Sequence, residues 1–175
     1  MNGKIVGTVI MVSALVAGAA LYYLQVYGFY EEASADVQEV RLMSLTAQEP
    51  VAILAEGIEA IDAESSPIRF RACFRTSSSL AMLTETYVGL DRAVPRNAPE
   101  WFDCFDASAL AAELQAGTAL AFLGEKNVAF GVDRIVAITD DGRGYIWHEL
   151  NDCGEKAYDG TVVGEECPNR MRTDA

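Results

Sequence analysis

The stretch IVGTVIMVSALVAGAALYYL, residues 5–24, decides the architecture of this chain. It contains no charged residue, no proline and no asparagine. As an α-helix these residues would span roughly 30 Å, which is the hydrocarbon thickness of a bilayer. The stretch therefore predicts one transmembrane anchor helix within residues 1–30, in contact with membrane lipid, and everything after it lies on one side of the membrane.

Two other structures fit part of this pattern. Ala17-Gly18-Ala19 has the small-x-small spacing that precedes a signal-peptide cleavage site, and Ala33-Ser34-Ala35 repeats it after the apolar stretch. The apolar run continues through Leu24, whereas signal peptides usually turn polar after the cleavage site. A buried core helix is the third possibility, but such helices are usually shorter. We therefore expect a retained anchor.

Aromatic and charged residues give the span a direction. An aromatic belt typical of the headgroup zone gathers at its C-terminal end, namely Tyr22, Tyr23, Tyr27, Phe29 and Tyr30. Lys4 and the terminal amine precede the span, whereas acidic residues follow it, namely Glu31, Glu32 and Asp36. Because positive charge stays inside, we expect a cytoplasmic N-terminus and a periplasmic domain of a bacterial inner-membrane protein.

Small residues recur four apart within the span. Ser13 pairs in this way with Ala17, and Ala14 pairs with Gly18. Small residues at this spacing let a second helix approach closely, although they are also common in spans generally. We expect this face to pack against a copy of itself or against another integral membrane protein subunit.

The part beyond the span is strongly acidic. It carries 12 basic and 26 acidic residues, a net charge of −14. Such a domain repels nucleic acid and an anionic membrane surface, and it attracts a basic partner such as a positively charged soluble protein. The solubility of an exported domain accounts for much of this charge as well.

All four cysteines lie beyond the span, namely Cys73, Cys104, Cys153 and Cys167. None forms Cys-x-x-Cys, so zinc-ribbon, thioredoxin and c-type haem signatures are missing. An even number in an oxidising compartment favours disulfides. Of the three possible pairings, Cys73–Cys104 with Cys153–Cys167 is the most local, but sequence leaves the pairing open. Buried reduced cysteines would instead contradict the exported topology.

The remaining patterns predict an α+β fold with an antiparallel sheet and about two helices. We expect a juxtamembrane linker and first strand in residues 31–49, followed by the α+β domain in residues 50–175. A short apolar run at residues 50–54 continues with polar interruptions at 58–62. Further strands are expected at residues 68–75, 119–123, 128–138 and 145–150. Turns are expected at residues 124–127 and, through Asp-Gly, at 140–144. Helices are expected within residues 77–87 and 107–116, the second capped by Asp106 and ended by Gly117.

Alternation in residues 68–75 places Arg69, Arg71, Cys73 and Arg75 on one face of the expected strand. A solvated face, or arginines paired with neighbouring carboxylates, is the simplest interpretation. The alternative is an anion contact, since the guanidinium fork matches planar anions. A small-ligand pocket near Trp101 is a related alternative.

No catalytic, metal or cofactor site is predicted. His148 is the only histidine, and we expect it to be an ordinary sheet residue. Two glycine-containing turns lack the phosphate-loop spacing. Four acidic residues could form an acidic pair or a calcium site, but solvated or capping roles fit them better, namely Asp62, Glu64, Asp103 and Asp106.

Several stretches resemble a family of uncharacterised, single-span membrane proteins from Rhodobacter-like alphaproteobacteria. They are residues 66–75, 83–88, 101–106, 122–127 and 142–148, and the resemblance extends over the whole chain. It implies an inner-membrane protein with a periplasmic domain. Some members carry a histidine-kinase label, which this chain does not support, because it has one histidine, no nucleotide-binding glycine boxes and too little length. The family carries no functional residues over to this chain.

These patterns lead to two hypotheses of different kinds. The first is a non-enzymatic accessory or assembly subunit of a larger membrane complex, respiratory or photosynthetic. The second is a membrane-anchored module that binds or senses a small ligand or anion. We do not expect an enzyme, because no nucleophile, base and orienting group can be named together.

Overall fold

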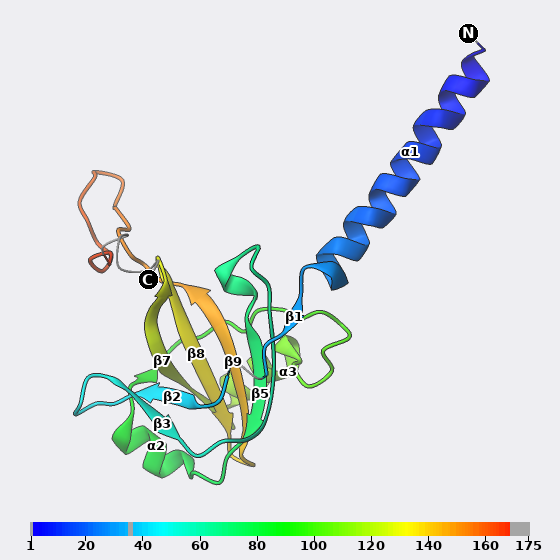
Figure 1. Cartoon of the computed structure of the whole chain (residues 1–175). Coiled ribbons are helices and arrows are strands. Elements are labelled where there is room, and N and C mark those ends of the chain that lie inside the picture. The colour runs from blue at the N-terminus through cyan, green and yellow to red at the C-terminus, as the bar shows by residue number, and fades with distance from the viewer. Residues whose placement is uncertain (1, 35–36, 169–175) are drawn as a thin grey trace.

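The structure is a computed structural model that describes residues 2–34 and 37–168, and in it one apolar helix leads away from a sheet-rich domain (Figure 1). Helix α1 (Gly3–Tyr23) begins at Asn2, whose side chain accepts a hydrogen bond from the Lys4 amide. It continues into a π-helical turn, η1 (Leu24–Gly28). The rest of the described chain buries no side chain of either segment. By length and composition, Gly3–Gly28 can cross a bilayer, as the sequence predicts.

The domain is built on a seven-stranded antiparallel sheet in the order β1-β4-β5-β9-β8-β7-β6. Its strands are β1 (Glu31–Glu32), β4 (Glu56–Asp62), β5 (Arg71–Arg75), β6 (Gly89–Leu90), β7 (Ala119–Ala129), β8 (Val132–Thr139) and β9 (Arg143–Leu150). A separate hairpin consists of β2 (Val40–Met43) and β3 (Pro50–Ile53). The helices α2 (Leu80–Thr86) and α3 (Ala107–Ala116) complete the α+β fold that the sequence predicts.

The sheet separates two hydrophobic clusters. On one face, Ala72, Phe74 and Ile146 pack with residues of the β2–β3 hairpin and with Leu83 of α2. On the other face, Cys73 and Trp147 pack with Phe105 and with Leu110 of α3. Side chains therefore alternate between the two clusters along β5 and β9, as a sheet covered on both faces requires. In Figure 1 the hairpin crosses in front of the sheet and α3 lies behind it.

Local sequence signals define the helix ends and one hairpin as expected. The Asp106 carboxylate accepts hydrogen bonds from two amides of the first turn of α3, and Gly117 ends the helix with φ +75°. The Ser79 side chain caps α2 in the same way. The β8–β9 turn contains Gly142 at φ +83°, where a side chain would be strained.

The strand expected at residues 68–75 is wrong in its first half. A 3₁₀ turn, η2 (Pro67–Arg69), replaces it, and the strand begins only at Arg71. The proline fixes the first residue of the turn in a helical φ. The Arg71 guanidinium then accounts for the bend, because it donates to the carbonyls of Ile68 and Phe70.

The turn expected at residues 124–127 is also wrong. Strand β7 continues through these residues with two shifts in its pairing to β8. Asn127 takes up φ +54°, and its amide donates to the Asp133 carboxylate. The glycine and asparagine therefore form bulges, which distort a strand without reversing it. The chain reverses between β7 and β8 at residues 130–131, so the single strand expected at residues 128–138 is wrong: its first two residues belong to β7 and residues 132–138 to β8.

The segment expected as a juxtamembrane linker is integrated into the domain from its first residues. Glu31 pairs with Asp62 across the β1–β4 ladder, and Ala33 is buried in the first hydrophobic cluster. The strand expected within residues 31–49 is present as β2. Ala35 of the second small-x-small triplet, and Asp36, lie outside the described residues, as do residues 169–175 of the expected turn-rich tail.

Gly144 provides a test of how tightly the central strands pack. A Cβ atom at this position would lie 2.1 Å from the Phe74 ring on the neighbouring strand. We expect Gly144→Ala to lower the free energy of unfolding by on the order of 2 kcal/mol, because the core has no room for it. Urea denaturation of the full chain in detergent measures the change.

Gly89→Ala on the edge strand is the matched control. The nearest atom to a Cβ there is 4.0 Å away, so this substitution should be close to neutral. Equal stabilities of the two variants would contradict the packing described here.

Candidate functional site

The C-terminal end of the apolar helix is attached to the domain through Trp101. The indole Nε1–H donates a 2.7 Å hydrogen bond to the Val26 carbonyl, which belongs to the last turn of the helix. The indole also stacks on Tyr27, with ring centroids 6.3 Å apart, and meets Tyr30 edge to face at 5.9 Å. We call these four residues the anchor seat. Because the last carbonyls of a helix lack partners within it, the indole satisfies a group that would otherwise need water or lipid.

Arg69 extends the anchor seat on the side of the domain. Its guanidinium lies 5.5 Å from the centre of the Tyr30 ring, within the range of a cation–π contact. One terminal nitrogen of this guanidinium is buried without a hydrogen-bond partner among the described residues. The arginine therefore packs against the aromatic cluster and does not project into solvent.

Strand β5 holds the loop that carries Trp101. The buried Arg71 guanidinium donates to the carbonyls of Arg96 and Asn97, at 2.9 and 3.0 Å. Two residues further along β5, Cys73 forms a disulfide with Cys104. Residues 97–104, with Trp101 between these points, are thus fastened at both ends to one face of one strand.

The burial of Arg71 changes its chemistry. Desolvation lowers the pKa of its guanidinium to about 10, so the group is still charged at neutral pH. Four carbonyl oxygens within 3.0 Å, two from the η2 turn and two from the loop, compensate for the lost water. The guanidinium fork is therefore occupied by backbone acceptors.

The three arginines for which the sequence leaves an anion contact as the alternative do not converge. Arg69 lies against Tyr30, Arg71 is buried under the loop, and Arg75 is exposed at the opposite end of β5. A cavity of about 450 Å³ lies beside Trp101, lined by Glu32, Ser34 and Glu59 together with apolar residues. The structure therefore provides no shared site in which these three guanidinium groups could hold one anion.

The second disulfide, Cys153–Cys167, closes a hairpin that follows β9. Together with Cys73–Cys104 it leaves no free cysteine in the chain. Of the three possible pairings of the four cysteines, this one joins the cysteines that lie closest in the sequence. Disulfides are typical of exported proteins, and the two pairs indicate an oxidising compartment.

A cleft with a volume of about 720 Å³ has an acidic lining. Its charged residues are Glu31, Glu32, Glu39, Asp62, Glu64 and Glu125, together with the cations Arg41 and Arg134. Arg41 pairs with Glu39 at 3.1 Å, and Arg134 lies 4.0 Å from Glu125. The carboxylates therefore outnumber the cations, and the cleft attracts positively charged groups. Because it begins at Glu31, it lies directly beside the exit of the apolar helix.

Arg134 connects the cleft to the one histidine. Its Nε donates at 3.1 Å to Nε2 of His148, and the His148 Nδ1–H donates at 2.7 Å to the Pro67 carbonyl. The Phe70 ring stacks on the His148 imidazole, and the Arg134 guanidinium lies over the face of the same Phe70 ring. Burial lowers the pKa of His148 to about 4, and it also lowers the pKa of Arg134. His148 is therefore a neutral, fully hydrogen-bonded sheet residue.

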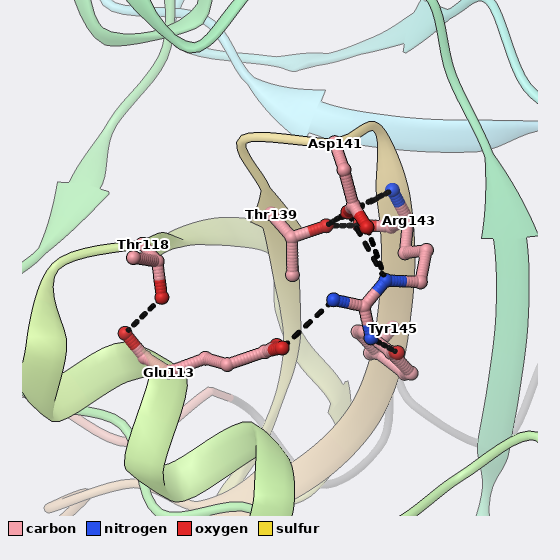
Figure 2. Close-up of polar contacts among 6 residues, drawn as sticks. All are labelled: Glu113, Thr118, Thr139, Asp141, Arg143 and Tyr145. Atoms are coloured by element: carbon pink, nitrogen blue, oxygen red, sulfur yellow. Dashed lines mark hydrogen bonds and ion pairs between the residues drawn. The ribbon is translucent and has the colours of Figure 1, made fainter.

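A second polar network closes the opposite end of the sheet (Figure 2). Arg143 of β9 donates to Asp141 of the turn at 2.8 Å, to Glu113 of α3 at 2.7 Å and to the Tyr145 hydroxyl at 2.9 Å. Hydrogen bonds from the Thr139 hydroxyl and from Arg143 lower the pKa of Asp141 to about 2. The hydrogen bonds to Glu113 and Asp141 raise the pKa of Arg143. All three nitrogens of the Arg143 guanidinium donate hydrogen bonds, so this network joins α3 to the β8–β9 hairpin.

The residues of the expected helix-packing face are exposed, and two of the residues considered for an acidic site form local hydrogen bonds. Ser13, Ala14, Ala17 and Gly18 are exposed on α1, and the Ser13 hydroxyl donates back to helix carbonyls. Asp106 caps α3, and Asp62 accepts a hydrogen bond from the Ala63 amide. Within residues 2–34 and 37–168, no group of three or more histidine, cysteine or acidic side chains could hold a metal ion.

Residues 40–168 match a family of unknown function, DUF6446, and the chain therefore belongs to this family. The match begins in β2, so it contains most of the domain and does not include α1 or β1. No curated protein and no solved structure matches the chain.

Sequence reasoning did not find the two features that define this region. The hydrogen bond of the anchor seat joins residues 75 positions apart, and no local pattern indicates such a contact. The acidic cleft collects carboxylates from several separate segments. The only available signal was the aromatic run at residues 101–105, which indicated burial without indicating a partner.

His148 makes stability depend on pH in a predictable direction. Its pKa in the folded chain is about 4, below its ordinary value of 6.5. Between these values the unfolded chain binds a proton that the folded chain does not, so stability falls as pH falls from about 6.5 to about 4. We expect a loss on the order of 3 kcal/mol across this interval from this group.

The matched measurement compares the wild type with His148→Gln by urea denaturation at a series of pH values. Glutamine does not titrate, so the difference in stability between the two proteins should shrink or reverse towards low pH. The same pH dependence in both proteins, or an imidazole that titrates near its ordinary pKa in an NMR titration, would contradict this account.

Proposed function

We propose that this chain is a single-span inner-membrane protein of alphaproteobacteria with an acidic periplasmic domain. In this proposal it acts as a non-enzymatic accessory or assembly subunit of a larger membrane complex, respiratory or photosynthetic. The observation that carries the proposal is the 2.7 Å hydrogen bond between the Trp101 indole and the Val26 carbonyl. A simple tether needs no such bond, whereas the bond fixes the domain relative to the helix, and a fixed arrangement suits a subunit that presents a surface to a neighbour in the membrane.

The membrane location is supported by the two ends of the apolar helix. Its length fits a bilayer, and its C-terminal end carries Tyr23, Tyr27 and Tyr30 next to Trp101. The alternative is a signal sequence. Cleavage at the second small-x-small triplet would remove β1 and the Val26 carbonyl, and would leave the Trp101 indole without its acceptor. The two disulfides and the flanking charges favour the periplasm for the domain.

The exposed helix surface supports a partner within the membrane. The described domain covers none of the side chains of α1. Ala14 and Gly18 lie one helical turn apart, and the Ser13 hydroxyl is turned back onto carbonyls of its own helix. This face therefore offers close backbone approach to a second helix, through van der Waals contact and not through exposed polar groups.

The acidic cleft supports a basic partner outside the membrane. It lies beside the helix exit and has an excess of carboxylates. The anchor seat holds this cleft in a fixed position relative to the span, so a basic segment of a neighbouring subunit could reach both surfaces together. The overall charge of the domain disfavours nucleic acid as the partner.

A second candidate is a membrane-anchored module that binds a small cationic ligand. The volume of the cleft, about 720 Å³, is in the range of small-molecule sites. Its charge favours a cation over the anion anticipated from the three arginines. A non-enzymatic role is supported by the engagement of both His148 ring nitrogens and of all four cysteines.

Substitution within the span tests the first candidate. We expect Ala14→Leu to reduce the amount of co-purified partner roughly fivefold or more, because a bulky side chain at a close helix contact costs about 1–3 kcal/mol. The full chain is purified in a mild detergent from cells that express it, and the proteins that accompany it are identified and quantified.

Ala19→Leu is the control, because Ala19 lies about 140° around the same helix from Ala14 and the added volume is identical. Partner recovery should be unchanged in this variant. Recovery of the wild type as an isolated monomer, without any accompanying protein, would count against an accessory or assembly role.

A further inference from the structure

The hairpin closed by Cys153–Cys167 is an ordered projection of the domain. Its two arms are joined by an antiparallel bridge between Lys156 and Val162 and by a hydrogen bond from the Val163 amide to the Glu155 carbonyl. A turn at its tip is closed by the Gly160 amide, which donates to the Ala157 carbonyl. At its base, Lys126 of β7 forms an ion pair with Glu165. The hairpin is therefore connected to the sheet by this ion pair as well as by the chain that leaves β9.

The tip of this hairpin, residues 157–163, presents apolar side chains to solvent. Tyr158 is fully exposed, and Val162 and Val163 are 57% and 60% exposed. The one charged residue of the tip is Asp159, whose carboxylate accepts a hydrogen bond from the Thr161 amide. The other acidic side chains of the hairpin lie towards its base. The tip is thus apolar and aromatic, on an acidic stem.

The hairpin and the apolar helix leave the domain at the same end. Glu31 pairs with Asp62, Ile61 with Arg71, and Arg71 with Trp147. The chain before β1 and the chain after β9 therefore extend past the same ends of these antiparallel strands. In Figure 1 both α1 and the hairpin project from this end at separate positions, whereas α2 lies at the other end.

We infer that the tip of the hairpin is a second membrane contact, in which Tyr158 lies in the lipid headgroup layer. The inference rests on the proposed retention of α1 as a membrane anchor. The bilayer is then present at this end of the domain, and a tyrosine ring with an apolar body and a polar hydroxyl is typical of that layer. The acidic stem limits the contact to the interface, because carboxylates are not drawn into hydrocarbon.

The consequence of two contacts is a fixed orientation of the domain. The anchor seat sets the position of the domain at one point, and the hairpin tip supports it at a second point across the sheet. Together they would keep the acidic cleft at a constant angle to the membrane.

Tryptophan fluorescence of the full chain in phosphatidylcholine nanodiscs tests this inference. Tyr158→Trp retains an interfacial side chain and adds a fluorophore, and the wild-type spectrum is subtracted to remove Trp101 and Trp147. The control is Met82→Trp, at an exposed position on α2 at the opposite end of the domain. We expect the added indole of Tyr158→Trp to emit at shorter wavelength, to resist acrylamide quenching, and to be quenched by brominated lipid. The added indole of Met82→Trp should show none of these changes.

Two other outcomes overturn the inference and differ from each other. If the protein is incorporated into the nanodiscs but the added indoles of the two variants behave alike, the hairpin is solvated and only the second contact is wrong. If the mature chain is found outside the bilayer, the proposed anchor itself is wrong, and the second contact falls with it.

Discussion

The hydrogen bond between the Trp101 indole and the Val26 carbonyl is the constraint on which the arrangement of this molecule depends. It satisfies a carbonyl at the end of an apolar helix, where a partner within the helix is missing. Tyr27 and Tyr30 surround the same indole, so the contact combines one directional bond with aromatic packing. A helix and a domain that the chain could have joined by a flexible tether are instead in direct contact.

The position of Trp101 in this contact depends on how tightly its loop is held to the domain. Strand β5 holds that loop twice on the same face, through the buried Arg71 guanidinium and through the Cys73–Cys104 disulfide. The first attachment consists of charge-assisted hydrogen bonds to backbone carbonyls and the second is covalent, and both start from β5. Reduction of the disulfide would therefore affect the anchor seat as well as the core.

The sequence predicts those parts of the structure that local chemistry determines. The Asp106 cap, the end of α3 at Gly117 and the reversal at Gly142 each depend on a few consecutive residues, and each is present. The wrong predictions at residues 68–70 and 124–127 concern places where a non-local contact decides between a turn and a strand, and the strand expected at residues 128–138 is interrupted by the reversal at 130–131. Arg71 is the clearest case. An alternating strand with arginines on one face resembles a solvated surface, and only the loop that crosses it shows that this arginine is buried.

The candidate site was less predictable than the fold for the same reason. The anchor seat and the acidic cleft are each assembled from segments far apart in the chain, and both lie beside the exit of α1. The most direct test of the account is backbone amide relaxation, measured by NMR on the full chain in nanodiscs. We predict that the β-sheet amides tumble with the disc in the wild type and more rapidly in Trp101→Phe, which lacks the indole N–H. A wild-type domain that already tumbles independently of the disc would contradict a rigid anchor seat.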